Sequence, residues 1–101
     1  TRYAERAQRT EAKSVLLDLS QRLERYYTDE GTYDGFSIPA GMARIPEQTS
    51  SNQRYAVTVT TADQTFTLRA APRGSQTKDK CGTLSLDNVG RRRASGQGDC
   101  W

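Results

Sequence analysis

The sequence contains no histidine, two cysteines and one tryptophan, and none of its apolar runs approaches the roughly 18 residues of a membrane-spanning helix. Without histidine, the chain lacks the commonest general base and the commonest metal ligand. The usual Ser-His and Cys-His nucleophile systems are excluded as well. Glycine-rich phosphate loops of the GxGxxG or GxxxxGK[ST] type are also missing. These absences argue against an enzyme, and we expect no catalytic residues, no cofactor and no metal.

Apolar residues are scarce. They make up 34% of the 101 residues, against 27% charged residues, and the mean hydropathy is −0.86. A chain of this length fits one domain and leaves no room for a second. We therefore expect a single domain with a small core that gains from an additional constraint.

The two cysteines, Cys81 and Cys100, both lie in the last quarter of the chain. Their spacing fits neither a CxxC redox pair nor a zinc cluster. One disulfide that closes a short C-terminal loop in an oxidising compartment accounts for them, and such a loop of about 20 residues stabilises a fold by roughly 3 kcal/mol. Two free buried thiols in a cytosolic protein are the alternative.

The net charge of +3 is unevenly distributed. Residues 18–34 hold five acids and two arginines, a local net charge of −3, whereas residues 69–101 hold seven bases and three acids, a local net charge of +4. The densest cationic run is Arg91, Arg92 and Arg93. These arginines are candidates for contact with an anion such as DNA, or they are solvated turn residues.

Three acids, Asp29, Glu30 and Asp34, lie close together in the acidic segment. Carboxylates are the ligands that calcium prefers, but the spacing of these three matches no known calcium loop. They are therefore interpreted as solvated surface residues.

Residues 2–29 contain no glycine or proline and are rich in Ala, Leu, Glu, Gln, Arg and Lys, which predicts a long helix. Gly31 is well placed to end it. Apolar residues recur in steps of three and four along one side of this helix, as expected for a side that packs on a core. They are Ala12, Val15, Leu16, Leu19, Leu23, Tyr26 and Tyr27.

The apolar stripe stops at Ala12, because the same steps taken backwards meet Arg9 and Glu5. The helix would be about 42 Å long in a domain about 26–34 Å across, so we expect residues 1–11 to project beyond the core. Five residues without charge repeat on the opposite side of the helix and are candidates for a subunit interface, or for an ordinary solvated face. They are Tyr3, Ala7, Thr10, Ser14 and Leu17.

The remaining sequence predicts a loop over residues 31–53, strands over residues 54–60 and 64–70 joined by a turn, and a third strand over residues 83–86 that ends at the turn 87–90. We therefore expect an α+β fold in which one long N-terminal helix packs on a small antiparallel sheet of three to four strands. A C-terminal loop closed by the disulfide completes it. The domain divides into the helix at 1–30, the loop at 31–53, the sheet at 54–87 and the disulfide-bounded region at 81–100.

Three segments of this sequence resemble the globular part of the type IV pilins, and in particular a minor pilin of the PilE kind. The first is the helix end LERYYTDEGTY at residues 23–33, and the second is the alternating hairpin at residues 55–70. The most specific is CGTLSLDNVG at residues 81–90, which leads to the final Cys100 and Trp101. Together the three segments span nearly all of the chain.

The resemblance implies a cleaved leader, a methylated N-terminal residue and an apolar helical segment that anchors a pilin in the inner membrane. That segment is absent here, so we expect a soluble truncation that begins in mid-helix. Residues 31–53 would correspond to the αβ-loop of the pilins and residues 81–100 to their D-region. Both regions commonly form subunit contacts or exposed surface.

The resemblance further implies a non-enzymatic minor pilin subunit of a type IV pilus in a Gram-negative bacterium. It would take part in pilus assembly or priming and in the fibre itself, and support twitching motility and adhesion. Its expected partners are other minor pilins and the major pilin, through the N-terminal helix, and the assembly machinery of the inner membrane. It would pass from the inner membrane and periplasm to the pilus at the cell surface. The alternatives are a DNA-binding receptor pilin that uses a basic D-region, and a type II secretion pseudopilin.

Overall fold

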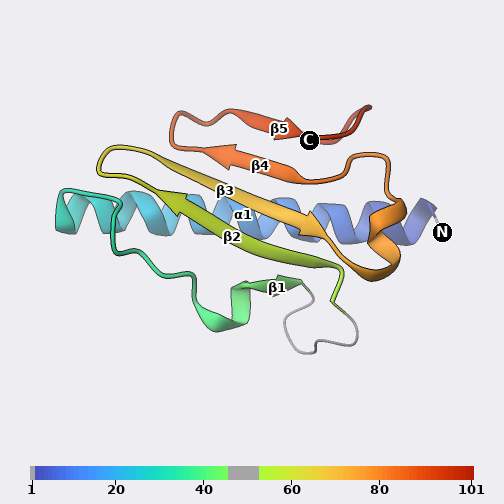
Figure 1. The fold of residues 1–101 in the computed structure, drawn as a ribbon, viewed down its shortest axis with the longest axis horizontal. Coiled ribbons are helices and arrows are strands. Elements are labelled where there is room, and N and C mark those ends of the chain that lie inside the picture. Colours follow the sequence, from blue (N-terminus) through green and yellow to red (C-terminus); the bar gives the residue numbers. More distant parts are fainter. Residues whose placement is uncertain (1, 46–52) are drawn as a thin grey trace.

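In the computed structural model, which describes residues 2–45 and 53–101, the helix α1 (Arg2–Glu30) lies across one face of an antiparallel sheet (Figure 1). Five strands of the described residues follow one another in chain order, each beside its neighbour in sequence. They are β1 (Arg44–Ile45), β2 (Tyr55–Thr61), β3 (Phe66–Pro72), β4 (Leu84–Asp87) and β5 (Arg92–Ala94). The molecule measures 43 × 28 × 16 Å. It consists of two layers, the helix and the sheet.

The predicted helix is confirmed at both ends. Its apolar stripe faces the sheet, and Ala12, Leu16, Leu19 and Leu23 are completely buried. Gly31 ends the helix: its φ of 76° is one that glycine adopts without strain, and its N–H donates to the carbonyl of Tyr27 at 2.8 Å.

The sheet covers the stripe with alternate residues of β2, β3 and β4. The predicted hairpin is confirmed, with Thr61 opposite Phe66 at its closed end and Val57 opposite Ala70 further along. Because successive side chains of a strand point to opposite faces, every second residue enters the core. Those buried against α1 are Tyr55, Val57, Phe66, Leu68, Ala70, Leu84 and Leu86.

The loop after α1 is fastened by aromatic contacts. Tyr33 is buried, stacks on Tyr27 with ring centroids 4.6 Å apart, and meets the ring of Phe66 edge-on at 5.0 Å. Burial, helped by the hydrogen bond from its hydroxyl to the Glu24 carboxylate, raises the pKa of Tyr33 to about 12. This loop therefore packs as part of the core.

The sheet has five strands instead of the three to four expected. The two additional ones, β1 and β5, have two and three residues, which is too short for an alternating pattern to be recognised. β1 lies within the predicted loop 31–53, of which residues 46–52 are outside the described part, and β5 lies in the predicted tail. A 3₁₀ turn, η1 (Ala40–Met42), precedes β1.

The expectation that residues 1–11 project beyond the core is wrong. The segment after β3, which contains the 3₁₀ turn η2 (Gly74–Lys78), packs against this part of α1. Arg9 is 8% exposed and belongs to the interior of the fold. Beyond these contacts, Arg2, Tyr3 and Ala4 are exposed, so about one helical turn extends past the packed region.

No helix of residues 2–45 and 53–101 is long and apolar enough to cross a membrane.

Candidate assembly and anion-binding surfaces

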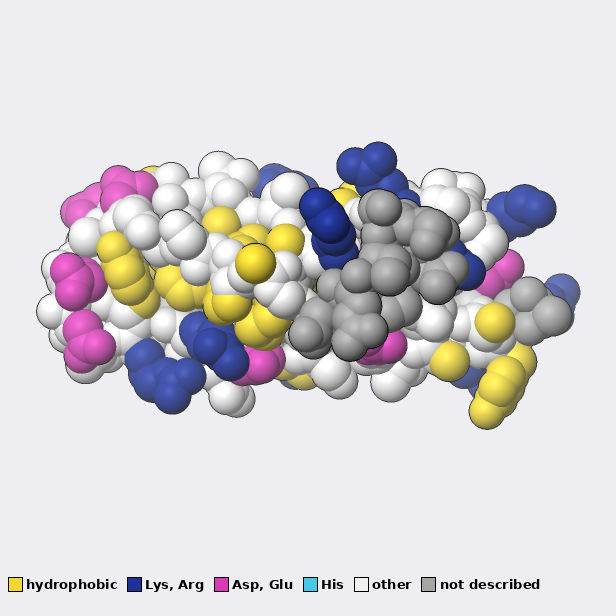
Figure 2. All heavy atoms as spheres, turned by 90° about the horizontal axis from the view of Figure 1, so that it is seen from below, with side chains coloured by type: hydrophobic (Ala, Val, Ile, Leu, Met, Phe, Trp, Pro, Cys, Tyr) yellow, Lys and Arg dark blue, Asp and Glu magenta, His cyan; other side chains and the backbone are white. Residues whose placement is uncertain are grey.

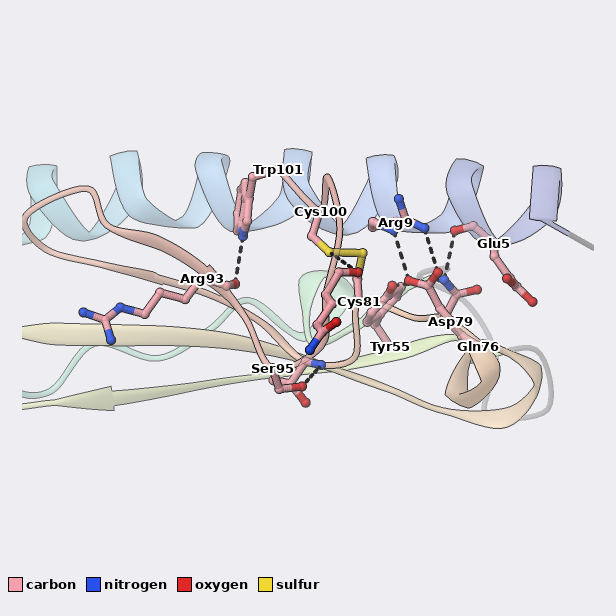
Figure 3. The surroundings of a disulfide bond; sticks show 12 residues. Glu5, Arg9, Tyr55, Gln76, Asp79, Cys81, Arg93, Ser95, Cys100 and Trp101 are labelled. Atoms are coloured by element: carbon pink, nitrogen blue, oxygen red, sulfur yellow. Dashed lines mark hydrogen bonds and ion pairs between the residues drawn. A yellow bond between two sulfur atoms is a disulfide. The ribbon is translucent and has the colours of Figure 1, made fainter.

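A buried ion pair fastens the N-terminal half of α1 to the rest of the molecule. Arg9 donates from Nε to Oδ2 of Asp79 at 3.0 Å and from Nη2 to Oδ1 at 2.7 Å (Figure 3). The two side chains are 9% and 1% exposed. This bidentate bond holds the pKa of Arg9 above its ordinary value, against the opposing effect of burial. The position of η2 beside α1 therefore depends on a charged contact.

Gln76 adds a second contact at the same place. Its Nε2 donates to the backbone carbonyl of Glu5 at 2.9 Å and to the hydroxyl of Tyr55 at 3.0 Å. Gln76 is 1% exposed, so both bonds are shielded from water. Together, Gln76 and the Arg9–Asp79 pair join helix, sheet and η2.

The predicted disulfide between Cys81 and Cys100 is confirmed. Their Cα atoms are 5.6 Å apart and both residues are buried, so the alternative of two free thiols does not hold. The N–H of Gly96 donates to the carbonyl of Cys81 at 2.9 Å, which lays the tail back over the start of β4. The indole of Trp101 donates to the carbonyl of Arg93 at 2.8 Å (Figure 3). The C-terminal loop is thus tied down at both ends.

The uncharged helix face, defined as Tyr3, Ala7, Thr10, Ser14 and Leu17, lies on the outside of α1. All five residues are exposed, with Tyr3 at 83% and Leu17 at 37%. Leu17 also borders a hollow of about 200 Å³ between α1 and the β4–β5 turn, where Phe66 and Leu86 form part of the wall. The structure therefore places the five residues on one surface away from the core.

The run Arg91–Arg93 is not one cationic cluster, because each of its side chains has different surroundings. Arg91 pairs with Asp87, Nε to Oδ2, at 3.2 Å, and the guanidinium of Arg92 lies 5.6 Å from the centre of the Trp101 ring. Arg92 and Arg93 belong to β5, so the interpretation of all three as turn residues is wrong. Of the three, Arg93 lies on the sheet face turned away from α1.

The sequence analysis named Arg93 as a candidate but missed Arg69, which the sheet brings to the same outer face. Arg69 lies beside Ser85, and Ser85 beside Arg93, so that a row crosses β3, β4 and β5. The carboxylate in the neighbouring row, Asp87, is already bonded to Arg91. The alternation in residues 64–70 gave the signal for Arg69, since it points outward wherever Leu68 points inward. The alignment of Arg93 with Arg69 could not be predicted, because it depends on the pairing of β5 with β4.

The acidic residues form no metal site. Within the described ranges 2–45 and 53–101, no group of three His, Cys, Asp or Glu side chains is arranged to hold a metal ion. Asp34 instead accepts a hydrogen bond from the Thr61 hydroxyl at 3.2 Å, and Asp29 and Glu30 are exposed.

A family model described as "Type IV minor pilin ComP, DNA uptake sequence receptor" matches residues 1–85. The chain belongs to this family of type IV minor pilins. The match covers α1, the hairpin and the first cysteine of this pilin, and leaves half of β4, all of β5 and Cys100 outside it. No curated protein sequence matches the chain.

Solved structures of other pilins share the whole fold. A type IV pilin from Shewanella oneidensis is 30% identical, with a TM-score of 0.73 over 96% of this chain and 97% of that one. The non-core minor pilin PilV from Neisseria meningitidis is 24% identical and shares the fold, with a TM-score of 0.71 over 98% and 94% of the two chains. The resemblance stated from sequence is thereby confirmed, and so is the role of a minor pilin in a type IV pilus.

Proposed function

We propose that this minor pilin enters the pilus through the uncharged helix face and serves there as a structural, non-enzymatic subunit. Its partners would be other minor pilins and the major pilin, and it would reside in the inner membrane and periplasm before assembly. Residues 31–53 and 81–100 would act as its αβ-loop and D-region.

The observation that carries this proposal is the exposure of uncharged residues along α1. Tyr3 and Leu17 are two of the three large hydrophobic residues that are exposed among the described residues, and both lie on this face. Burial of such side chains against a neighbouring helix removes apolar surface from water, at about 25 cal/mol per Å². The third exposed residue, Val89, lies in the β4–β5 turn, whose residues border the same hollow as Leu17. The hollow thus adjoins both the uncharged helix face and the β4–β5 turn.

The test is the double substitution Ala7→Glu and Leu17→Glu. Both sites are exposed, so the free energy of unfolding of the isolated domain should change by no more than about 0.5 kcal/mol per site. In the full-length pilin, the charges would be buried at the contact and should reduce incorporation, measured by immunoblotting of sheared pili. Thr58→Glu with Ala62→Glu adds the same charge at an exposed position of β2 and in the exposed turn after it, and should leave incorporation unchanged. Normal incorporation of the helix variant would refute the proposal.

DNA binding is the second candidate function. It is favoured by the description of the matching family as a DNA uptake sequence receptor and by the row of Arg69 and Arg93 on the outer sheet face. If these two arginines contact phosphates, Arg69→Gln with Arg93→Gln should weaken DNA binding and lower the salt slope of log K by about 2 in gel shifts. Arg91→Gln with Arg92→Gln should have a smaller effect, because Arg91 already pairs with the Asp87 carboxylate and Arg92 lies over the Trp101 ring. Among the described residues, Arg69, in contrast, donates only to the uncharged Thr60 hydroxyl. Equal effects of the two pairs would contradict this placement.

A further inference from the structure

The two ends of this molecule carry opposite charge. Where α1 finishes, four carboxylates lie on the helix end and on the two loops beside it, and Figure 2 shows acidic side chains gathered at that end, on the left. Hydrogen bonds from Thr32 to the Asp63 carbonyl and from Thr61 to the Asp34 carboxylate hold these loops together. We call this set the acidic end. It consists of Asp29, Glu30, Asp34 and Asp63.

The position of Asp29 and Glu30 does not stabilise the isolated fold. A helix C-terminus carries partial negative charge, which favours basic residues in the last turn, and α1 has none there. In the described part of the chain, neither carboxylate forms an ion pair. These two exposed carboxylates are therefore available to an external partner of positive charge.

A basic groove lies near the other end of α1. It has a volume of about 740 Å³ and runs between the first turns of the helix and the segment after η2. Besides the internally paired Arg9 and Asp79, its wall carries five cations and two carboxylates, an excess of three positive charges. The carboxylates are Glu5 and Asp99. The cations are Arg2, Arg6, Lys13, Lys78 and Lys80.

We propose that the acidic end of one copy of this pilin docks in the basic groove of a second copy. The chain itself carries both complementary surfaces, and they lie toward opposite ends of a molecule 43 Å long. Such a contact is heterologous, so a bound pair still offers one free groove and one free acidic end, and copies follow one another along an axis. Thr10 lines the groove and also belongs to the uncharged helix face, so the two surfaces adjoin.

The contact is electrostatic and therefore depends on salt. Exposed ion pairs are individually weak, but several acting together steer and hold a complex at low ionic strength. At about 0.5 M salt the screening length falls to a few ångströms, and the association should disappear. A contact formed by apolar surface would not respond in this way.

Charge exchange tests the proposal in the 101-residue domain by sedimentation equilibrium at about 20 mM and about 500 mM NaCl. Lys78→Glu with Lys80→Glu reverses part of the groove, and Asp29→Lys with Glu30→Lys reverses part of the acidic end. Each double variant alone should raise the dissociation constant of self-association about tenfold or more. All four substitutions in one chain should restore it, as should an equal mixture of the two double variants.

Two further variants serve as controls. Arg69→Glu with Arg93→Glu makes the same change in net charge on the outer sheet face and should associate like the wild type. Arg2→Glu with Arg6→Glu changes the charge of the groove from the helix side and should weaken self-association in the same way. This variant replaces the Lys78/Lys80 variant in the test if a thermal melt shows that the latter is unfolded.

Three results would overturn the proposal. They are a wild-type domain that stays monomeric at low salt, a four-site variant that does not regain association, and groove variants that lose DNA binding but self-associate normally. The last result would make the groove a DNA surface. None of them bears on the Ala7→Glu and Leu17→Glu test, so a failure of this proposal and a failure of the assembly role can be told apart.

Discussion

Arg9 is a charged residue that works as part of the core. A bare guanidinium could not be buried at this position, but the Asp79 carboxylate binds it through two hydrogen bonds and compensates for the lost water. The sequence could not reveal this arrangement, because the partner lies 70 residues away and a charge on a helix face normally marks the end of the buried stripe. The extent of the core was therefore underestimated at this residue.

Arg9→Ala should lower the free energy of unfolding by about 3 kcal/mol, because it leaves the Asp79 carboxylate buried without its partner. Arg22→Ala is the matched control: its pair with Asp18 is exposed, at 42% and 50%, and should cost less than about 1 kcal/mol. Urea denaturation followed by circular dichroism measures both. If the two variants lose the same free energy of unfolding, the buried pair contributes no more to stability than the exposed one.

Whether a helix or strand could be predicted from the sequence depended on its length. α1 has 29 residues and β2 and β3 have seven each, so their periods repeat often enough to be recognised. β1 and β5 exist because a neighbouring strand offers them hydrogen-bonding partners, and nothing in their own two or three residues distinguishes them from a loop. For the same reason the uncharged helix face could be predicted, whereas the row of Arg69 and Arg93 could not.

The disulfide is expected to hold the C-terminal element in place. It closes a loop with a sequence separation of 19, for which the chain-entropy relation gives about 3 kcal/mol. The variant Cys81→Ser with Cys100→Ser, which leaves no free thiol, should lose that amount in urea denaturation. Reduction of the wild type should produce the same loss. A variant as stable as the oxidised wild type would show that the surrounding hydrogen bonds suffice.

Over the whole molecule, the apolar contacts of the core and the charged and polar contacts of α1 lie at different places along the long axis. On α1 the fully buried apolar residues lie between Ala12 and Leu23, whereas the turns before Ala12 are held by Arg9 and by the bond from Gln76. Segments with few apolar contacts open at lower free energy than a central core. The first turns of α1 together with η2 are thus expected to open as a unit while the hairpin stays folded.

Hydrogen exchange with two variants tests this separation. If the end opens by itself, Val57 remains packed in the open form, because it is buried in the central core. Val57→Ala should then speed exchange of the β2 and β3 amides by roughly thirtyfold, for a loss of about 2 kcal/mol, and leave residues 5–9 and 74–79 unchanged. Arg9→Ala should speed exchange in both regions, because it destabilises the native state relative to the open and the unfolded forms alike. Equal acceleration of both regions by Val57→Ala would mean that the pilin unfolds as one cooperative unit, with the buried ion pair fully coupled to the apolar core.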